Sequence, residues 1–115
     1  MDYLAKELRL PPGGASLRIL ALGPLTNIAK ALEANRGRLR GIRSVVVMGG
    51  AISAAGNLGD GGVFKTDNKV AEWNIYIDPL AASKVFTSDV PIEMVPLDAT
   101  NRVPIDANFV RSFSS

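Results

Sequence analysis

The side chains best suited to binding a ligand stand near the middle of the chain. Glu72 and Asn74 are two residues apart, in a segment over residues 72–77 that we expect to be extended, so that both side chains would point to one face. A carboxylate accepts hydrogen bonds and a carboxamide both donates and accepts them, so the pair could hold vicinal or terminal hydroxyl groups. The competing interpretation is a half-exposed strand, of which such polar–aromatic–polar alternation is more often typical.

Other polar residues follow glycine-rich or apolar stretches. Asn57 follows Gly56 in the stretch 51–70, which has no regular apolar period and is expected to be a long loop. Loops of this length are often functional, although a simple turn is the alternative because Gly and Asn both tolerate positive φ. Asp98 and Thr100 follow an expected strand, at the edge where parallel sheets bind ligands, and we assign them a supporting role there.

The elements that would position these residues alternate between strands and helices. Apolar runs of strand length end at Gly or Pro, and Leu25, Ile28, Ala29 and Leu32 recur at helical spacing. This alternation predicts an α/β fold with a partial, open, mostly parallel sheet of about three core strands, flanked by helices on both faces. We expect strands at 17–22, 44–48 and 91–96, and helices at 2–10, at 24–34, from Asp78 and from 103–106 onward.

Local signals mark where two of these helices begin. Asp78 followed by Pro79 is a capping residue followed by the first helical residue. Thr26 fits a first-turn residue that satisfies free helix N–H groups better than it fits a ligand. The buried face of the helix that starts at Asp78 is expected to consist of Ala82, Val85 and Phe86.

The composition is that of an ordinary globular domain. The chain has 115 residues, no cysteine, and 13 basic against 11 acidic residues. The lack of cysteine excludes disulfides and thiolate metal sites, and the small net charge gives little support to nucleic-acid binding. The cluster Arg36, Arg38, Arg40 and Arg43 lacks interleaved aromatic residues and is typical of solvated surface. No apolar run approaches the ~20 residues of a membrane span, and the acidic start does not fit a signal peptide, so we expect a cytoplasmic location.

One stretch superficially resembles a phosphate-binding loop. Residues 59–66 place Phe64 where that pattern needs a glycine before the lysine, and no expected strand leads directly into them. No G-x-G-x-x-G motif follows a strand either, so a dinucleotide site is unsupported. An unrelated α/β module that binds nucleotide phosphates through its glycine loops nevertheless stays open as an alternative function.

Three motifs stand in a fixed order along the chain. They are Ala21-Leu-Gly-Pro-Leu-Thr-Asn-Ile-Ala29, Val45-Val-Val-Met-Gly-Gly-Ala51 and Ala71-Glu-Trp-Asn-Ile-Tyr-Ile-Asp-Pro79. Together they closely resemble the inosine-uridine nucleoside hydrolase family, whose members cleave the N-glycosidic bond of ribonucleosides. Each motif alone is weak evidence, but the three in this order are jointly specific. The resemblance covers residues 2–105 and implies a nucleoside-hydrolase-like fold and a ribonucleoside substrate.

The resemblance also assigns roles to individual positions. It implies that Asn57 and Glu72 hold the 5′-hydroxyl of the ribose and that Asn74 contacts its 2′/3′ side. It further implies that Met48 packs near the ribose and that Leu22 lends its backbone carbonyl to a catalytic Ca²⁺. Calcium accepts backbone carbonyls as ligands, so a leucine is acceptable there, and Leu22 could serve as a core residue at the same time.

The catalytic groups of that family have no counterpart in this sequence. The resemblance implies a water that is held by Ca²⁺ and deprotonated by an aspartate of an N-terminal Asp-x-Asp-x-Gly-x-Asp-Asp motif, and a C-terminal Asp/His region that supplies the leaving-group acid. The chain contains no such motif and no histidine. We therefore expect residues 1–115 to be a single partial domain, the central part of a nucleoside hydrolase, which carries the ribose-binding wall and is inactive alone. A non-catalytic remnant or subunit that binds ribose weakly is the alternative, and full-length members are expected to be homo-oligomers.

Overall fold

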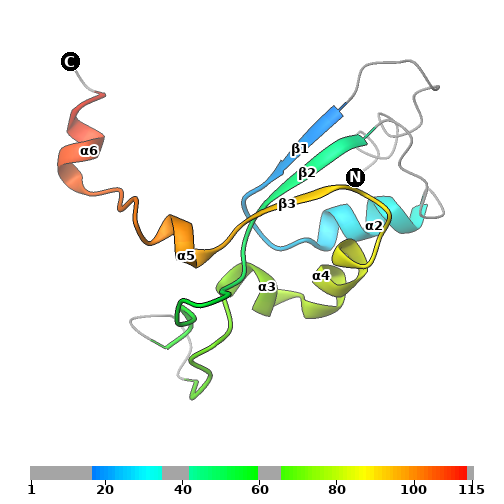
Figure 1. Ribbon diagram of the computed structural model, residues 1–115, viewed down its shortest axis with the longest axis horizontal. Coiled ribbons are helices and arrows are strands. Elements are labelled where there is room, and N and C mark those ends of the chain that lie inside the picture. The colour runs from blue at the N-terminus through cyan, green and yellow to red at the C-terminus, as the bar shows by residue number, and fades with distance from the viewer. Residues whose placement is uncertain (1–16, 35–41, 60–65, 114–115) are drawn as a thin grey trace.

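The computed structural model describes residues 17–34, 42–59 and 66–113 (Figure 1). Three strands form a parallel sheet in the order β1-β2-β3, which confirms the expected α/β fold. The longest described helix has 9 residues, and none of those described is long and apolar enough to cross a membrane. The expected helix over residues 2–10 lies outside the described residues. The elements are β1 (Leu17–Ala21), α2 (Thr26–Ala34), β2 (Ile42–Met48), α3 (Trp73–Ile77), α4 (Pro79–Phe86), β3 (Ile92–Val95), α5 (Leu97–Thr100) and α6 (Ala107–Arg111).

The three strands end at a common edge of the sheet. Ala21 of β1 is paired with Val47 of β2, and Met48 of β2 is paired with Val95 of β3. The N–H of Gly49 donates to the carbonyl of Val95 at 3.2 Å, which continues the β2–β3 ladder by one residue. The segments that follow all three strands therefore start from the edge at which open α/β sheets bind ligands.

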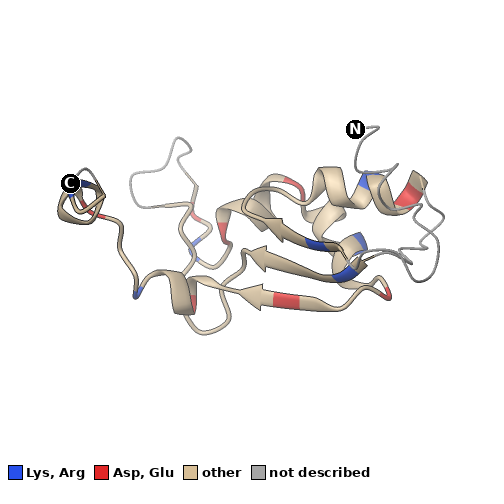
Figure 2. Ribbon diagram, turned by 90° about the horizontal axis from the view of Figure 1, so that it is seen from above, with Lys and Arg blue, Asp and Glu red and all other residues tan. Residues whose placement is uncertain are grey.

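Both crossover helices lie on the same face of the sheet. α2 connects β1 to β2 and α4 lies between β2 and β3, and the two helices pack side by side (Figure 1, Figure 2). The expectation of helices on both faces is therefore wrong for the described part of the chain. The reason is topological, because the order β1-β2-β3 repeats the crossover in one direction, and right-handed crossovers in one direction place their helices on one face.

The core lies between this helical layer and the sheet. The four residues expected at helical spacing in α2 are all buried, as are Val45 and Val47 of β2, which have no exposed surface. α4 contributes Ala82 and Val85, as expected, whereas Phe86 is 39% exposed, so its assignment to the buried face was wrong. Phe86 is the last residue of α4, where the helix ends and the chain turns away. The buried residues of α2 are Ile28, Ala29, Ala31 and Leu32, and Leu25, which precedes the helix, is buried with them.

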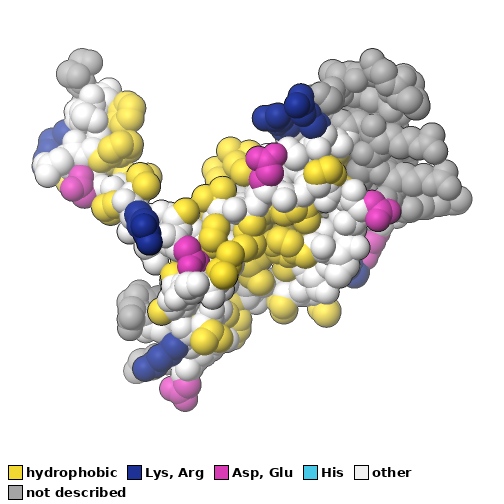
Figure 3. All heavy atoms as spheres, in the orientation of Figure 1, with side chains coloured by type: hydrophobic (Ala, Val, Ile, Leu, Met, Phe, Trp, Pro, Cys, Tyr) yellow, Lys and Arg dark blue, Asp and Glu magenta, His cyan; other side chains and the backbone are white. Residues whose placement is uncertain are grey.

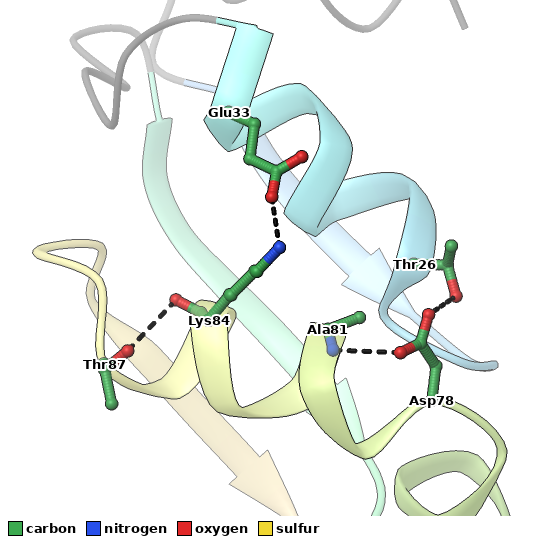
Figure 4. Close-up of polar contacts among 6 residues, drawn as sticks. All are labelled: Thr26, Glu33, Asp78, Ala81, Lys84 and Thr87. Carbon is green, nitrogen blue, oxygen red and sulfur yellow. Dashed lines mark hydrogen bonds and ion pairs between the residues drawn. The ribbon is translucent and has the colours of Figure 1, made fainter.

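Polar contacts join α2 to α4 at both ends of their interface (Figure 4). The side chain of Asp78 caps α4, as expected, by accepting the N–H of Ala81 at 3.0 Å. The Thr26 hydroxyl donates to the other oxygen of Asp78 at 2.6 Å, so its role differs from the expected capping of its own helix. This bond and the Ala81 N–H hold the pKa of the Asp78 carboxyl below its usual value. At the other end, Lys84 of α4 forms an ion pair with Glu33 of α2.

The opposite face of the sheet carries exposed apolar side chains. Leu20 and Val95 have exposed fractions of 64% and 36%. The strand register places Val46 beside Leu20, on the face turned away from the helices. Figure 3 shows hydrophobic side chains gathered over the sheet on this side of the molecule.

Candidate functional site

The segment expected to be extended is instead the beginning of a helix. α3 spans Trp73–Ile77, and Glu72 is its N-cap with extended backbone angles, φ −90° and ψ 146°. The prediction of an extended segment over residues 72–77 was therefore wrong, and with it the argument that Glu72 and Asn74 share a strand face. The physical reason is the cap, because Glu72 accepts the otherwise unpaired N–H groups of the first helical turn and stabilises the helix locally.

The Glu72 carboxylate is buried and held by three backbone N–H groups. Its Oε1 accepts the N–H of Asn74 at 2.9 Å. Its Oε2 accepts the N–H groups of Ile75 at 3.1 Å and Gly50 at 3.0 Å. The residue is only 2% exposed. Since an ionised carboxylate accepts about four hydrogen bonds, Glu72 has a fixed orientation and about one acceptor position left on Oε1.

The glycine pair after β2 makes this arrangement possible. A Cβ at Gly49 would lie 3.3 Å from Glu72 Oε2 and 3.3 Å from Ile75 Cδ1, so a larger residue would press on the carboxylate. Gly50 has φ of +80°, a conformation that L side chains rarely adopt. Gly50 could not be predicted as a site residue from its residue type, because its contribution comes from its backbone N–H group. The only signal for it in the sequence is the Gly-Gly pair at the end of a strand.

Asn74 joins α3 to the end of β2. Its Nδ2 donates to the backbone carbonyl of Met48 at 3.0 Å and to the Met48 sulfur at 3.2 Å. Asn74 is 9% exposed. The side-chain amide thus fixes the Met48 side chain and its own Oδ1 in one orientation, and Oδ1 has no hydrogen-bond partner among the described residues.

Asn57 reaches the same place from the glycine-rich loop. Its Oδ1 accepts the N–H of Trp73, the first residue of α3, at 2.8 Å. Its own N–H donates to the carbonyl of Ala71 at 3.1 Å. Gly56 packs closely against the backbone of Ala71, since a Cβ at Gly56 would lie 2.2 Å from the Ala71 oxygen. The structure therefore brings Asn57, Glu72, Asn74 and Met48 together around the start of α3, with the donor Asn57 Nδ2 unpartnered among the described residues.

Leu22 follows β1 at the same edge of the sheet. Its side chain is 69% exposed, so the interpretation of Leu22 as a core leucine was wrong in the described structure. A backbone carbonyl alone does not make a calcium site, because Ca²⁺ takes about 6–8 oxygen ligands with carboxylates among them. No group of three or more His, Cys, Asp or Glu side chains able to hold a metal occurs in the described ranges. These residues therefore do not by themselves fit a bound calcium ion.

Asp98 and Thr100 both belong to α5, directly after β3. Asp98 Oδ2 accepts the N–H of Ile52 at 2.9 Å, and Oδ1 accepts those of Ser53 at 2.8 Å and Ala54 at 3.0 Å. The Ile52 and Ser53 N–H groups are the main reason why the pKa of the Asp98 carboxyl lies below its ordinary value. The Thr100 hydroxyl oxygen is buried without a hydrogen-bond partner among the described residues.

A pocket of about 300 Å³ opens beside Asp98. Its lining contains neither Glu72 nor Asn74, so this hollow is separate from the cluster at the start of α3. The lining residues are Ser53, Ala54, Leu97, Asp98, Asn101 and Arg102.

Several known proteins that are similar to this chain are named as nucleosidases or nucleoside hydrolases. The model of the family described as inosine-uridine preferring nucleoside hydrolase matches residues 1–115. A probable uridine nucleosidase 1 of Oryza sativa subsp. japonica is 38% identical over 102 residues, which are 89% of this chain and 28% of that protein. The pyrimidine-specific ribonucleoside hydrolase RihA of Citrobacter koseri is 37% identical over 113 residues, which are 98% of this chain and 32% of that protein.

A solved structure is similar in the same way. The inosine-uridine preferring nucleoside hydrolase of Bacillus anthracis superimposes with a TM-score of 0.77 at 28% sequence identity. The match covers 98% of this chain and 35% of that one. This chain thus spans about a third of the length of the curated relatives and the solved structure that it matches.

Proposed function

This chain belongs to the inosine-uridine preferring nucleoside hydrolase family, and from that premise we propose that it serves the hydrolysis of a ribonucleoside to ribose and free base. Its described part would supply the wall that binds the ribose. The observation that carries the proposal is the cluster of Glu72, Asn74, Asn57 and Met48 around the start of α3. The cytoplasmic location and the homo-oligomeric state of full-length members stay predictions.

The cluster has the chemistry that a sugar needs. In our proposal Asn57 and Glu72 bind the 5′-hydroxyl, one as a donor through Nδ2 and the other as an acceptor through the remaining position on Oε1. Asn74 would accept a hydroxyl of the 2′/3′ side through Oδ1, and Met48 would pack against the ribose. Because backbone N–H groups and the Met48 carbonyl already hold these side chains, little conformational entropy would be lost on binding.

Rigid hydroxyl contacts also suit the reaction. Cleavage of a ribosyl C–N bond passes through an oxocarbenium-like centre, and only contacts that strengthen in the transition state accelerate it. A carboxylate fixed by three N–H donors keeps its remaining lone pair aimed while the sugar ring changes shape. We propose that the residues of this chain contribute binding and orientation of the sugar, and not the activation of water.

Calcium enters the proposal only through Leu22. We propose that the Leu22 carbonyl is one oxygen ligand of a Ca²⁺ ion whose carboxylate ligands lie outside the described residues. A metal ion of this kind supplies an activated water in hydrolytic enzymes. Because the described residues do not complete such a site, we expect the isolated chain to bind sugar without turnover.

The experiment is a titration of the chain with inosine, uridine and a mononucleotide, each with and without Ca²⁺. Calorimetry measures binding, and the release of free base measures turnover. The proposal predicts weak, saturable binding of both nucleosides, with no preference for the phosphorylated ligand and no turnover. Asn57→Ala is expected to weaken nucleoside binding, and Asn108→Ala in the distant α6 is the matched control. Tighter binding of the mononucleotide would favour the phosphate-binding alternative, and no binding of either nucleoside would overturn the proposal.

A further inference from the structure

The turn from β3 into α5 holds the segment that follows β2. The N–H of Leu97 donates to the carbonyl of Gly50 at 2.9 Å, directly after the bond from Gly49 to Val95. The Asp98 carboxylate then binds the next N–H groups along the segment. Residues 49–54 are therefore hydrogen-bonded along most of their length to residues 95–98.

Among these contacts, the side-chain hydrogen bonds are those of Asp98. Three consecutive N–H groups, from Ile52 to Ala54, point at one carboxylate at distances between 2.8 and 3.0 Å. Consecutive N–H groups that converge in this way form a concavity for an anion. The negative charge of Asp98 occupies that concavity from within the chain, and it fixes the peptide planes of the loop.

The same segment carries the Gly50 N–H that binds Glu72. Both backbone polar groups of Gly50 are hydrogen-bonded, since its N–H donates to Glu72 Oε2 at 3.0 Å and its carbonyl accepts the Leu97 N–H. Its φ of +80° has to be maintained by its neighbours, because glycine alone has wide conformational freedom. The N–H groups that bind Asp98 begin two residues after Gly50.

We propose that Asp98 is a positioning residue of the ribose site: its carboxylate fixes residues 52–54 and thereby holds the Gly50 N–H against Glu72. This inference rests on the proposed function, in which Glu72 binds the sugar. Asp98 touches no part of that cluster itself, and it acts through the backbone between Ala54 and Gly50.

The geometry requires a carboxylate at this position. In Asp98→Asn one oxygen becomes an NH₂ group, which cannot accept the N–H of Ile52 if the remaining oxygen keeps those of Ser53 and Ala54. The lowered pKa of Asp98 is consistent with N–H groups that favour its charged form. The variant therefore removes the hydrogen bond from the Ile52 N–H while it preserves the size of the side chain.

The test is residue-resolved amide hydrogen exchange, measured by NMR on the whole chain and on Asp98→Asn. Exchange of the Gly50 amide and of amides 52–54 is expressed relative to the Val45 and Val47 amides of β2, so that a global loss of stability cancels. We expect the relative protection of Gly50 to fall about tenfold or more in Asp98→Asn. The control is Asp89→Asn, which changes an exposed aspartate in the turn before β3.

A second measurement on the same samples separates positioning from a merely structural role. Under conditions where both proteins are folded, Asp98→Asn is expected to weaken inosine binding by about threefold or more, whereas Asp89→Asn leaves it unchanged. If amides 52–54 lose protection while Gly50 and the inosine affinity stay at wild-type values, Asp98 is only a loop tether and the inference is wrong. If the wild-type chain does not bind inosine at all, the proposed function fails, and the Gly50 exchange rates still decide whether Asp98 holds that N–H group.

Discussion

Glu72→Gln tests whether the buried carboxylate is held as the structure shows. The amide oxygen of Gln can keep the two hydrogen bonds of Oε2, but the new NH₂ group then faces the N–H of Asn74. One charge-assisted hydrogen bond is lost and a buried N–H is left without an acceptor. The expected loss in the free energy of unfolding is about 1.5–3 kcal/mol. Urea denaturation, monitored by circular dichroism, measures this loss. An unchanged m-value would show that the variant differs from the wild type in stability and not in the surface exposed on unfolding.

The matched control removes a glutamate charge at the surface. Glu33→Gln breaks the ion pair with Lys84, in which the Glu33 side chain is 54% exposed and the Lys84 side chain 57% exposed. Because water screens such pairs, we expect a much smaller loss in the free energy of unfolding. Glu72→Gln should also increase exchange of the Asn74 amide, which loses its acceptor, and Glu33→Gln should not. If both variants unfold at the same urea concentration as the wild type, the Glu72 carboxylate does not cap α3, and the reasoning about the site is refuted.

Further predictions concern packing and pH. Gly56→Ala would place a Cβ 2.2 Å from a backbone oxygen and is expected to cost several kcal/mol or prevent folding, whereas Gly23→Ala, with no atom within 4 Å of its Cβ, should be nearly neutral in thermal melts. Leu25→Ala, at a position with no exposed surface, should cost about 2–5 kcal/mol in urea unfolding. Leu20→Ala, at a 64% exposed position, should cost about 1 kcal/mol or less. Because the pKa of Asp78 is lowered in the folded state, its stabilising contribution is present above the ordinary value of 3.8 and lost as the pH falls through the lowered pKa. Asp78→Asn should therefore flatten the acid limb of a stability–pH profile, and an unchanged limb would contradict this.

The order of strands and helices could be predicted from the sequence because it depends on apolar periodicity. The spacing of Leu25, Ile28 and Leu32 predicted a buried helical face, and the Asp78–Pro79 pair predicted the start of α4, both of which the structure confirms. α3 was missed because it has only 5 residues and depends on the Glu72 cap, which leaves no periodic pattern. The placement of α2 and α4 on one face was missed because it depends on the order of strands in the sheet, which residue patterns do not specify.

The site could be predicted in its residues but not in its construction. Asn57, Glu72 and Asn74 have side chains of recognisable chemistry, and the structure brings them together. What joins them are backbone groups, such as the Gly50 N–H and the Met48 carbonyl, and every residue type except proline carries both. Such contacts become visible only once the fold places the end of β2 against the start of α3.

A ribose site at the start of α3 can be tested by a ¹⁵N–¹H NMR titration of the chain with D-ribose. We expect saturable shifts at the side-chain amides of Asn57 and Asn74 and at the backbone amide of Gly50, while the side-chain amide of Asn108 in α6 stays unchanged. Resonances at these three groups that do not move while others do, or that move no more than that of Asn108, would contradict a ribose site at the start of α3.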